Sequence, residues 1–461
     1  MEDTAYDVIV IGAGAAGLAS AYGAAANGAR VALVERDRWL GGECPNSACV
    51  PTQTLLRVAR VHSLMAHADQ FGLANADGPI AYRRIKAHKD HVVAQTAARH
   101  TTADDLAKAG IILIRGQASF RDIHTLQVAD RTLTGRQFVI ATGSHCVAPP
   151  IEGLKQTPFL THREMLDLDA VPDSLVVLGG GPVGVEFAQL MAVFGCDVTV
   201  LEYGPHILGQ EDEDIAALIH KQLEGFGVTI RTGFCATKVR GTQGSITVEG
   251  TVGQEPQTHT GSLLLAATGM APNIDGLHLE TIGVAIEKGG ITTDEHLRTS
   301  VPHIWAVGDV TTLPRFTSTA HYEGGIVAHN VTHQDKRSVD LRVLPRALAC
   351  EPEIASVGAT EAKLRQAGRG IVVGRADVAT LGRALIDQAP VGFVKVMADS
   401  ATGQILGAAI ASPHASELIH ELALAMKLQA PVTAIPELIH TFPSYAEAVA
   451  LACADAARQL P

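Results

Sequence analysis

The sequence predicts an α/β protein with two parallel-sheet domains of one kind and a smaller α+β domain at its C-terminal end. Three observations support this prediction. A unit made of a β-branched run, a glycine-rich turn, an amphipathic stretch and a second β-branched run occurs twice. Each copy is followed by apolar runs that are typical of buried strands. From about residue 341 the pattern changes to alternating strands and amphipathic helices.

The first copy of the unit spans residues 7–35 and the second spans residues 174–202, and both contain G-x-G-x-x-G. In each copy an acidic residue follows 18 positions after the last glycine. This pattern indicates a βαβ unit that binds a dinucleotide. The first glycine permits the tight turn, the second lets backbone N–H groups approach a pyrophosphate, and the third lets the helix pack on the strand. The acid is placed to accept ribose hydroxyls. The residues in these roles are Gly12, Gly14, Gly17 and Glu35 in the first copy, and Gly179, Gly181, Gly184 and Glu202 in the second. The sequence therefore predicts two Rossmann-like dinucleotide-binding domains.

Segments that share the letters A-T-G follow both copies, at residues 141–143 and 267–269. Each indicates a buried strand that leaves its sheet through a glycine turn, where the chain can cross to another domain. A third apolar strand ends at Asp309, and an acid at the end of such a strand in a doubly wound sheet faces the ligand crevice. These crossings predict a discontinuous first domain at 1–150 and 275–340, and a second domain at 151–274.

The last domain, residues 341–461, has no phosphate loop. Residues 391–410 alternate like two antiparallel strands with a turn at 401–403, residues 416–428 have the pattern of an amphipathic helix, and a long final helix is expected near 445–460. An interface role is the simplest assignment for this domain.

The composition excludes several classes of protein. Lys and Arg number 36 against 48 Asp and Glu, a net charge of −12 without a basic block, so we expect no nucleic-acid partner. Seven cysteines in 461 residues are too few for a disulfide scaffold, and an odd number of cysteines cannot all pair. No uncharged apolar stretch reaches about 18 residues, and the acidic N-terminus lacks the features of a signal peptide. We therefore expect no membrane span and a cytoplasmic protein.

Two cysteines, Cys44 and Cys49, follow directly after the first nucleotide unit. Within one ideal helix they would point to different sides and lie too far apart to bridge. Where a loop enters a helix, with Pro45 restricting the chain, their sulfurs could meet. A thiol at a helix N-terminus also has a lowered pKa, which favours the thiolate that disulfide exchange needs. The position of the pair therefore favours a redox role over two unrelated buried cysteines.

Over essentially its whole length the chain resembles the flavoprotein pyridine-nucleotide–disulfide oxidoreductases, such as dihydrolipoamide dehydrogenase, glutathione reductase and mercuric reductase. The resemblance rests on both glycine motifs, the two cysteines, both A-T-G segments and the G-D segment at 308–309. It implies FAD on the first unit, a nicotinamide nucleotide on the second and a homodimer joined by the last domain. It also implies active sites built across the dimer interface.

By position, the resemblance assigns Cys49 as the thiolate that faces the flavin and Cys44 as the thiol that exchanges with substrate. Besides the first motif and Glu35, the positions implied to bind FAD are Gly42, Gln53, Ala118, Thr142, Gly143, Ser144, Asp309, Phe316 and Thr317. Besides the second motif and Glu202, the positions implied to bind the nicotinamide nucleotide are Glu186, Val239 and Gly269. No residue is assigned to a metal.

The carboxylate of Glu202 favours the free 2′-hydroxyl of NADH over the 2′-phosphate of NADPH. Residues 203–214 contain no Arg or Lys that would receive that phosphate. NADH is therefore the expected coenzyme, and NADPH the less favoured one.

The C-terminal segment departs from the family pattern. Phe442 stands where the family's disulfide reductases carry a histidine that acts as general acid–base, while the glutamate that follows it is kept as Glu447. A phenyl ring carries no proton, and that role contributes about 10²–10⁴ in rate. His440 and Tyr445 are the candidates to replace the histidine, although a surface His and a packed Tyr are the more common roles for such residues.

Two further positions depart from the pattern. Gln53 replaces a lysine that normally pairs with the acid at Glu186 and brings positive charge near the flavin and the thiolate. Its loss should raise the pKa of Cys49. Met270 replaces an arginine, and no functional account of this change follows from the sequence.

These patterns predict an FAD-dependent oxidoreductase that passes electrons from NADH through flavin to the Cys44–Cys49 disulfide, and on to a disulfide or a thiol-seeking acceptor such as a metal ion. The acceptor is expected to be a small molecule or small thiol. Because the exchange half lacks the usual histidine, we expect dye or quinone reduction to be intact and lipoamide or glutathione reduction to be weak. Two alternatives stay open: an NADH-dependent quinone or metal-ion reductase (a diaphorase) working directly from the flavin, and a non-enzymatic redox sensor or scaffold that retains FAD.

Overall fold

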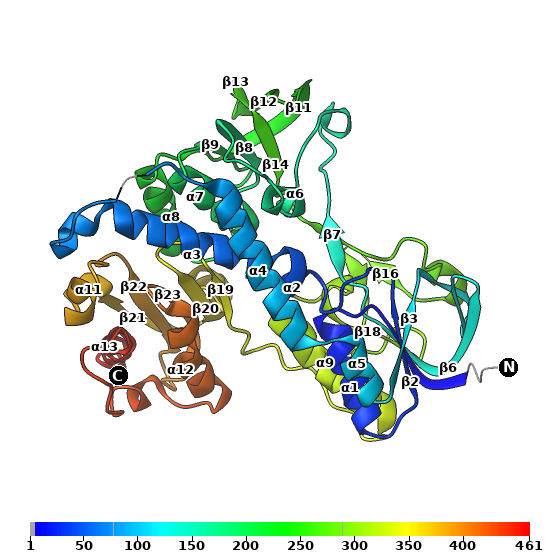
Figure 1. Cartoon of the computed structure of the whole chain (residues 1–461). Coiled ribbons are helices and arrows are strands. Elements are labelled where there is room, and N and C mark those ends of the chain that lie inside the picture. The colour runs from blue at the N-terminus through cyan, green and yellow to red at the C-terminus, as the bar shows by residue number, and fades with distance from the viewer. Residues whose placement is uncertain (1–4, 77, 288) are drawn as a thin grey trace. The chain divides into compact units, whose positions relative to one another are not determined.

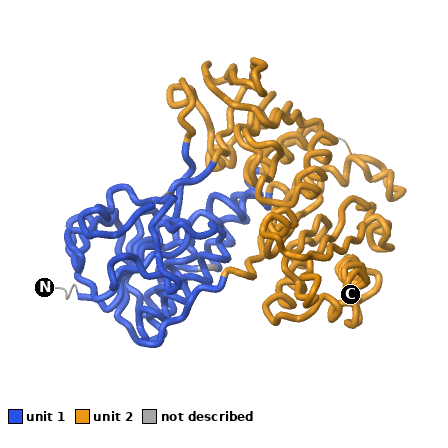
Figure 2. Tube along the Cα trace, turned by 180° about the vertical axis from the view of Figure 1, so that it is seen from behind, with its two compact units in different colours: residues 1–54, 86–147, 269–340 blue, residues 55–85, 148–268, 341–461 orange. Residues whose placement is uncertain are grey.

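The computed structural model describes residues 5–76, 78–287 and 289–461. The chain divides into two compact units (Figure 2). Unit 1 contains residues 1–54, 86–147 and 269–340, and unit 2 contains residues 55–85, 148–268 and 341–461. Two of the crossings between the units lie within helices, α3 (Cys49–Ala66) and α4 (Tyr82–His100).

Unit 1 is built on a seven-stranded sheet of order β3-β2-β1-β6-β5-β4, in which β18 pairs with β6. Its strands are β1 (Ala5–Ile11), β2 (Val31–Glu35), β3 (Ile111–Arg115), β4 (Ala118–Asp122), β5 (Thr125–Val128), β6 (Arg131–Ile140) and β18 (Ile304–Ala306). Strands β3, β2, β1, β6 and β18 run parallel. β1 and β2 are buried along most of their length because both faces of a parallel sheet are covered, which explains their continuous apolar runs.

Two helices of unit 1, α1 (Ala15–Ala26) and α9 (Thr317–Thr332), lie side by side (Figure 1). A glycine permits their close approach, since a Cβ at Gly324 would lie 2.4 Å from the carbonyl oxygen of Ala16. Gly308 lies against the same place, where its Cβ would be 3.2 Å from the Ala16 side chain. The packing therefore holds the G-D segment against the first turn of α1.

The smaller elements of unit 1 surround this sheet. They are α2 (Glu43–Ser47), α5 (Ala103–Lys108), β7 (Ser144–Cys146), which pairs with β15 (Met270–Pro272), and β16 (Ile286–Glu287), which pairs with β17 (Gly290–Ile291).

Unit 2 contains the second glycine motif, in a parallel sheet of order β10-β9-β8-β14. The strands are β8 (Ser174–Leu178), β9 (Asp197–Leu201), β10 (Thr229–Arg231) and β14 (Leu263–Ala266), with helices α6 (His162–Leu166), α7 (Pro182–Val193) and α8 (Glu213–Gly225). An antiparallel sheet follows, made of β11 (Phe234–Thr242), β12 (Ser245–Val252) and β13 (Glu255–Gly261). Both predicted strand–turn–helix–strand units are thus present, as β1–α1–β2 and β8–α7–β9, and the predicted fold class is confirmed.

The C-terminal part of unit 2 is an antiparallel sheet of order β19-β20-β23-β22-β21 packed with helices. Its strands are β19 (Arg346–Leu348), β20 (Ile354–Gly358), β21 (Ile371–Asp377), β22 (Phe393–Asp399) and β23 (Ile405–Ala411), and its helices are α10 (Glu361–Gln366), α11 (Gly382–Ile386), α12 (Ala415–Lys427) and α13 (Ala446–Ala457). The predicted hairpin turn at 401–403 joins β22 to β23. The final helix, α13, is shorter than the predicted 445–460.

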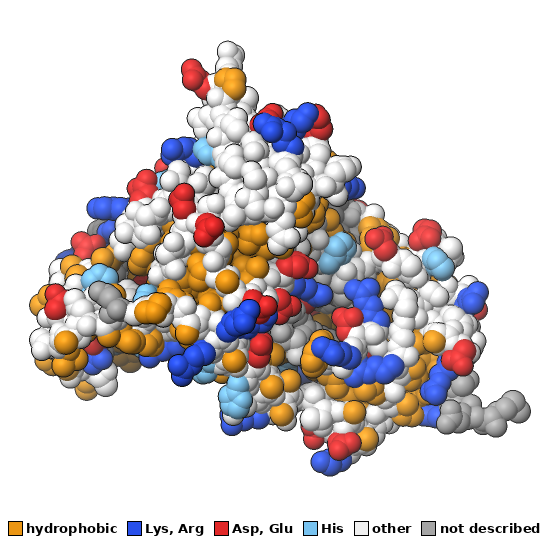
Figure 3. All heavy atoms as spheres, turned by 45° about the horizontal axis from the view of Figure 1, so that its top comes forward, with side chains coloured by type: hydrophobic (Ala, Val, Ile, Leu, Met, Phe, Trp, Pro, Cys, Tyr) orange, Lys and Arg blue, Asp and Glu red, His pale blue; other side chains and the backbone are white. Residues whose placement is uncertain are grey.

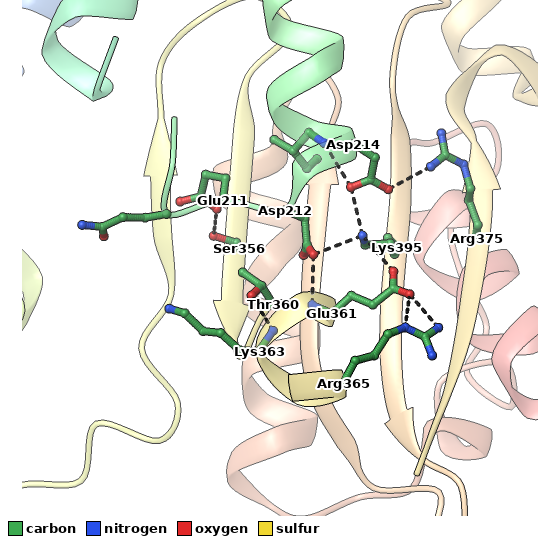
Figure 4. A network of polar contacts seen from close by, with 12 residues as sticks. Glu211, Asp212, Asp214, Ser356, Thr360, Glu361, Lys363, Arg365, Arg375 and Lys395 are labelled. Carbon is green, nitrogen blue, oxygen red and sulfur yellow. Dashed lines mark hydrogen bonds and ion pairs between the residues drawn. The ribbon is translucent and has the colours of Figure 1, made fainter. Parts of the chain in front are cut away.

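A buried ion network joins the start of α8 to this C-terminal sheet within unit 2 (Figure 4). The Lys395 side chain is 5% exposed, and its Nζ lies 3.2 Å from Asp212, 2.9 Å from Asp214 and 3.3 Å from Glu361. Burial opposes the charge of Lys395, but the hydrogen bonds and charges of Asp214 and Asp212 outweigh it and raise the pKa of the ammonium group. One ammonium group therefore links the start of α8 to the C-terminal sheet.

Within the described ranges, no helix has the length and apolar character that a membrane span requires. On the face shown in Figure 3, acidic and basic side chains are interspersed rather than gathered by sign. This distribution agrees with the sequence, which has no basic block.

Candidate functional site

The two predicted dinucleotide loops have the same backbone geometry. Gly12 and Gly179 both adopt φ +102°, and a Cβ there would lie 2.3 Å and 2.5 Å from a backbone carbonyl oxygen, respectively. Gly14 and Gly181 each precede a helix, and among the described residues no atom beyond their own chain neighbours lies closer than 3.9 Å to where their Cβ would be. This open space, beside the N–H groups at the start of each helix, fits the pyrophosphate of a dinucleotide.

The acid of each motif also closes its own loop. The carboxylate of Glu35 accepts a hydrogen bond of 2.7 Å from the N–H of Ala13, which follows the first glycine, and one of 2.8 Å from the N–H of Asp37. Glu202 accepts the two equivalent bonds at 2.6 Å and 2.5 Å. Each carboxylate oxygen keeps a further lone pair, so both acids can still accept from a ribose hydroxyl. The repeat in the sequence is therefore a repeat of hydrogen bonds as well.

The structure brings the two sulfurs of the cysteine pair within hydrogen-bonding reach. Cys44 lies in the short helix α2 and Cys49 begins α3, while Ala48 between them has φ −139° and ψ −98° and interrupts the helix. The Cys44 sulfur accepts hydrogen bonds from the thiol and backbone N–H of Cys49 and from the hydroxyl of Thr317. Both cysteines are free thiols in this structure.

These contacts make Cys44 an acidic thiol. The hydrogen bond from Cys49 lowers its pKa most, burial opposes the change, and Thr317 adds to the lowering, with the result that the pKa falls to about 6. A thiol with this pKa is largely thiolate at neutral pH, which is the nucleophilic and metal-binding form. The contact from Thr317, at the first turn of α9, was not foreseen, since the sequence placed this residue only at the flavin.

Asp309 lies in the short turn that follows β18, beside three other polar residues of unit 1. Its Oδ2 accepts a hydrogen bond of 2.9 Å from Ser144. Burial raises the pKa of Asp309, the Ser144 hydroxyl and the Arg315 charge oppose this, and the Glu43 charge reinforces it. Two predicted residues, Ser144 and Asp309, therefore lie together, close to the helix that carries Cys44.

Arg315 fixes three backbone segments around Asp309. Its guanidinium donates to the carbonyl oxygen of Asp309 at 3.1 Å, to that of Met270 at 2.7 Å and to that of Gly289. An arginine presents several donors in a rigid planar fork, which suits it to such an anchor.

Asn273 holds the first A-T-G turn and was not predicted from the sequence. Its side-chain NH2 group donates to the carbonyl oxygens of Thr142 at 2.9 Å and Ser144 at 3.1 Å, and its backbone carbonyl oxygen accepts from the Thr142 hydroxyl at 2.7 Å. The turn also contains Gly143, at φ +71°. The signal was available, because the asparagine follows the second A-T-G segment by four residues.

Glu323 of α9 is a second residue that the sequence did not reveal. It is fully buried, its Oε2 accepts from the Gly308 N–H at 2.7 Å, and its Oε1 has no hydrogen-bond partner among the described residues. Burial raises the pKa of Glu323 to about 7, and the Asp309 charge adds to this. The carboxyl therefore fixes the residue that precedes Asp309.

The other positions implied to bind FAD occupy varied environments. Gly42 packs against the first loop, since its Cβ would lie 2.9 Å from the Cα of Gly14. Ala118 is buried at the start of β4, Phe316 directly precedes α9, and Gln53 is exposed on α3.

The remaining positions implied for the nicotinamide nucleotide are Glu186, Val239 and Gly269. Val239 is buried in β11 and donates its N–H to the carbonyl oxygen of Glu152. Glu186 accepts a hydrogen bond of 3.1 Å from the Ala349 N–H; burial raises its pKa to about 7 and this bond opposes the change. Gly269 adopts φ +140° between β14 and β15.

The two candidates for the missing acid–base have their polar atoms engaged. His440 lies with Nε2 3.0 Å from Glu421 and Nδ1 3.2 Å from the carbonyl oxygen of Leu438. Tyr445 is buried and donates its hydroxyl to Asp387, and burial together with that carboxylate raises its pKa to about 12.

The neighbouring residues of this segment differ in exposure. Phe442 is 81% exposed. Glu447, in the first turn of α13, accepts the N–H of Ser444 at 2.9 Å and so closes the turn before the helix.

Comparison with known families gives matches over nearly the whole chain. The family described as pyridine nucleotide-disulphide oxidoreductase matches residues 6–324, and its dimerisation domain matches residues 344–453. The second match supports a homodimer.

Similar proteins are found among curated sequences and solved structures. A mercuric reductase of Staphylococcus aureus is 34% identical over 98% of this chain and 82% of its own length. A dihydrolipoyl dehydrogenase of Haloferax volcanii is 35% identical over 99% of this chain and 97% of its own. The structure of the HOCl-induced flavoprotein disulfide reductase RclA from Escherichia coli matches with a TM-score of 0.87 at 31% identity, over 97% of this chain and 99% of that one. The Cu(II) complex of the same protein matches with the same TM-score.

Proposed function

Because the chain belongs to the pyridine nucleotide-disulphide oxidoreductases, an FAD-dependent family of enzymes, we propose that it passes electrons from NADH to the Cys44–Cys49 pair and from there to a soft metal ion. The observation that carries this proposal is the acidic thiol of Cys44, in contact with Cys49 and Thr317, in a chain with phenylalanine at position 442. The family membership disfavours the non-enzymatic alternative.

The site residues of unit 1 each have a defined part in this proposal. FAD, when bound, supplies the chemistry that accepts a hydride and delivers two electrons to a disulfide. The loop at Gly14 binds the pyrophosphate, Glu35 binds the ribose, and Asp309 with Ser144 offers hydrogen-bonding groups beside the cysteine-bearing helix. Cys49 receives the electrons, and Cys44 is the thiolate that meets the acceptor.

A soft metal ion suits this site better than a disulfide. Reducing a disulfide requires a proton for the leaving thiolate, and Phe442 replaces the histidine that supplies one in related enzymes. A metal ion needs thiolate ligands instead, and Cys44 is a thiolate at neutral pH without help from a base. The names of the relatives agree, since one is a mercuric reductase and the solved relative binds Cu(II).

The electrons balance for either ion. The Cys44 thiolate and the Cys49 thiol, which releases its proton to solvent, together lose two electrons and form the disulfide bond. These electrons reduce one Hg(II) to Hg(0) or two Cu(II) to two Cu(I). Electrons from NADH then break the disulfide again.

NADH is the proposed coenzyme because Glu202 holds a negative charge at the ribose position. Its carboxylate is fixed by two backbone N–H groups, so it cannot easily turn away from a 2′-phosphate. We expect kcat/KM for NADH to exceed that for NADPH at least about tenfold, and Glu202→Ala to reduce this ratio. A wild-type ratio of one or less would overturn the assignment.

The central experiment locates the electrons. Anaerobic protein with its FAD is alkylated with and without excess NADH, and the labelled cysteines are identified by mass spectrometry. We expect NADH to expose two new thiols, Cys44 and Cys49. We also expect Cys44→Ser to lose at least about a hundredfold in NADH-dependent Hg(II) or Cu(II) reduction while dye reduction continues. Cys235→Ser, which removes an exposed cysteine outside the pair, is the matched control.

The diaphorase alternative gives the opposite result. If metal-ion reduction survives Cys44→Ser, electrons leave from the flavin itself and the proposed route is wrong.

A further inference from the structure

A second pair of sulfur atoms lies in unit 1, outside the Cys44–Cys49 site. Cys146 ends β7 and Met270 begins β15, and the two residues stand directly opposite each other in the antiparallel pair. Opposed residues of a ladder project to the same face. The Cys146 thiol accordingly donates to the thioether sulfur of Met270 at 3.4 Å. Both residues are only partly buried, so an ion from solvent can reach them.

The donor set of this pair is selective. Thiolate and thioether ligands select soft ions such as Cu(I), whereas Mg²⁺ and Ca²⁺ require oxygen ligands. A structural zinc site needs four ligands, and the part of the chain that the structure describes holds no group of three or more His, Cys, Asp or Glu residues arranged for a metal. Cu(I) is satisfied by fewer donors than that, and two sulfurs match it.

The sulfurs lie closer together than a two-coordinate Cu(I) ion requires, since a linear arrangement places them about 4.6 Å apart, so a side chain must rotate when the ion binds. Two metal–sulfur bonds of about 2.3 Å would subtend about 95° when the sulfurs are 3.4 Å apart. Methionine has three rotatable side-chain bonds, so Met270 can widen this angle without moving the strand.

The surroundings hold the two strands in place. The carbonyl oxygen of Met270 accepts from Arg315, which also donates to the carbonyl oxygen of Asp309. Ser144, two residues before Cys146, donates to the Asp309 carboxylate. The backbone that carries both sulfurs is therefore fixed by the same hydrogen bonds that fix the Asp309 turn.

We propose that Cys146 and Met270 form a separate binding site for one soft monovalent ion, Cu(I). On binding, the Cys146 thiol releases its proton and both sulfurs coordinate the ion, with no change of oxidation state. The role of the site rests on the proposed function: it would hold the reduced ion after it leaves Cys44. The site also gives a reason for methionine at position 270, where the family commonly has arginine.

The test uses Ag(I), a soft monovalent ion that is not reduced by thiols at this site, and methionine labelled with ¹³C in its methyl group. The starting protein carries FAD and has Cys44→Ser and Cys49→Ser, so that the redox pair binds no silver. We expect one equivalent of Ag(I) to shift one of the methionine methyl resonances. Met270→Leu should remove that resonance, and Cys146→Ser should lower the apparent silver affinity at least about tenfold.

Matched variants serve as controls. Met65→Leu removes an exposed methionine and Cys235→Ser an exposed cysteine, and both should leave the shift and the affinity unchanged. Met270→Leu nearly conserves volume, and FAD content with the thermal midpoint shows that each variant is folded.

The proposal is overturned if silver shifts no methionine resonance, or if the shifted resonance persists in Met270→Leu. Failure of the proposed function has a different signature. Metal reduction that survives Cys44→Ser would refute the electron route, while a silver shift at Met270 would still establish the binding site.

Discussion

Replacing Thr317 by valine should weaken the thiolate of Cys44. The hydrogen bond from Cys49 is the main reason that the pKa of Cys44 lies at about 6, burial opposes the change, and the Thr317 hydroxyl contributes a further hydrogen bond. Valine keeps the shape of threonine but has no hydroxyl to donate. Loss of one hydrogen bond to a charged group corresponds to about 1.5 kcal/mol, or about one pKa unit.

The assay is the pH dependence of Cys44 alkylation by iodoacetamide in the reduced protein, followed by mass spectrometry of the Cys44 peptide. Only the thiolate reacts, so the rate rises with pH through the pKa. With a pKa near 7 instead of 6, the thiolate fraction at pH 6 falls from about one half to about one tenth, and the rate falls about fivefold. The two rates converge at alkaline pH, where both thiols are ionised.

Ser318→Ala is the matched control, because it removes an exposed hydroxyl in the same helical turn. A wild-type midpoint near the ordinary thiol value of about 8.5 would refute the hydrogen-bond argument for Cys44. The same conclusion would follow if Thr317→Val left the midpoint in place.

Three further outcomes are expected. Lys395→Met should lower the free energy of unfolding in urea by about 3–5 kcal/mol, because it leaves the buried carboxylate of Asp212 without its cation. Lys363→Met, which removes an exposed lysine of α10, should change it by less than about 0.5 kcal/mol, and equal effects of the two substitutions would contradict the buried network. His440→Gln should change the rate of NADH-dependent metal reduction less than about twofold, because the ring nitrogens of His440 are engaged with Glu421 and Leu438. A loss of about a hundredfold would instead identify His440 as the general acid–base. Glu323→Gln should stabilise the protein relative to wild type by an amount that grows as pH rises from about 4.3 to about 7 and reaches on the order of 3 kcal/mol above that range. The reason is that the raised pKa of the buried carboxyl favours its neutral form, so the wild type loses stability as pH rises through that pKa. A difference in urea midpoint that does not change with pH would contradict this prediction.

Local features of this protein follow from the sequence alone. The glycine spacing, the acid 18 residues later and the β-branched runs specify each βαβ unit, because turn, helix and strand geometry depend on neighbouring residues. The hairpin turn at 401–403 is predictable for the same reason. The proximity of Cys44 and Cys49 also belongs here, since only a break in the helix was needed to bring sulfurs five residues apart together.

Tertiary structure alone decided which residues from distant parts of the chain meet in unit 1. The Thr317 hydroxyl reaches Cys44, Glu323 holds Gly308, and the sulfur of Cys146 meets that of Met270 only because helices and strands from separate segments pack together. Hydrogen bonds and sulfur contacts act over a few ångströms, so no spacing in the chain encodes them. The pKa of Cys44 depends on those same contacts and on burial, and it is therefore a property of the folded chain.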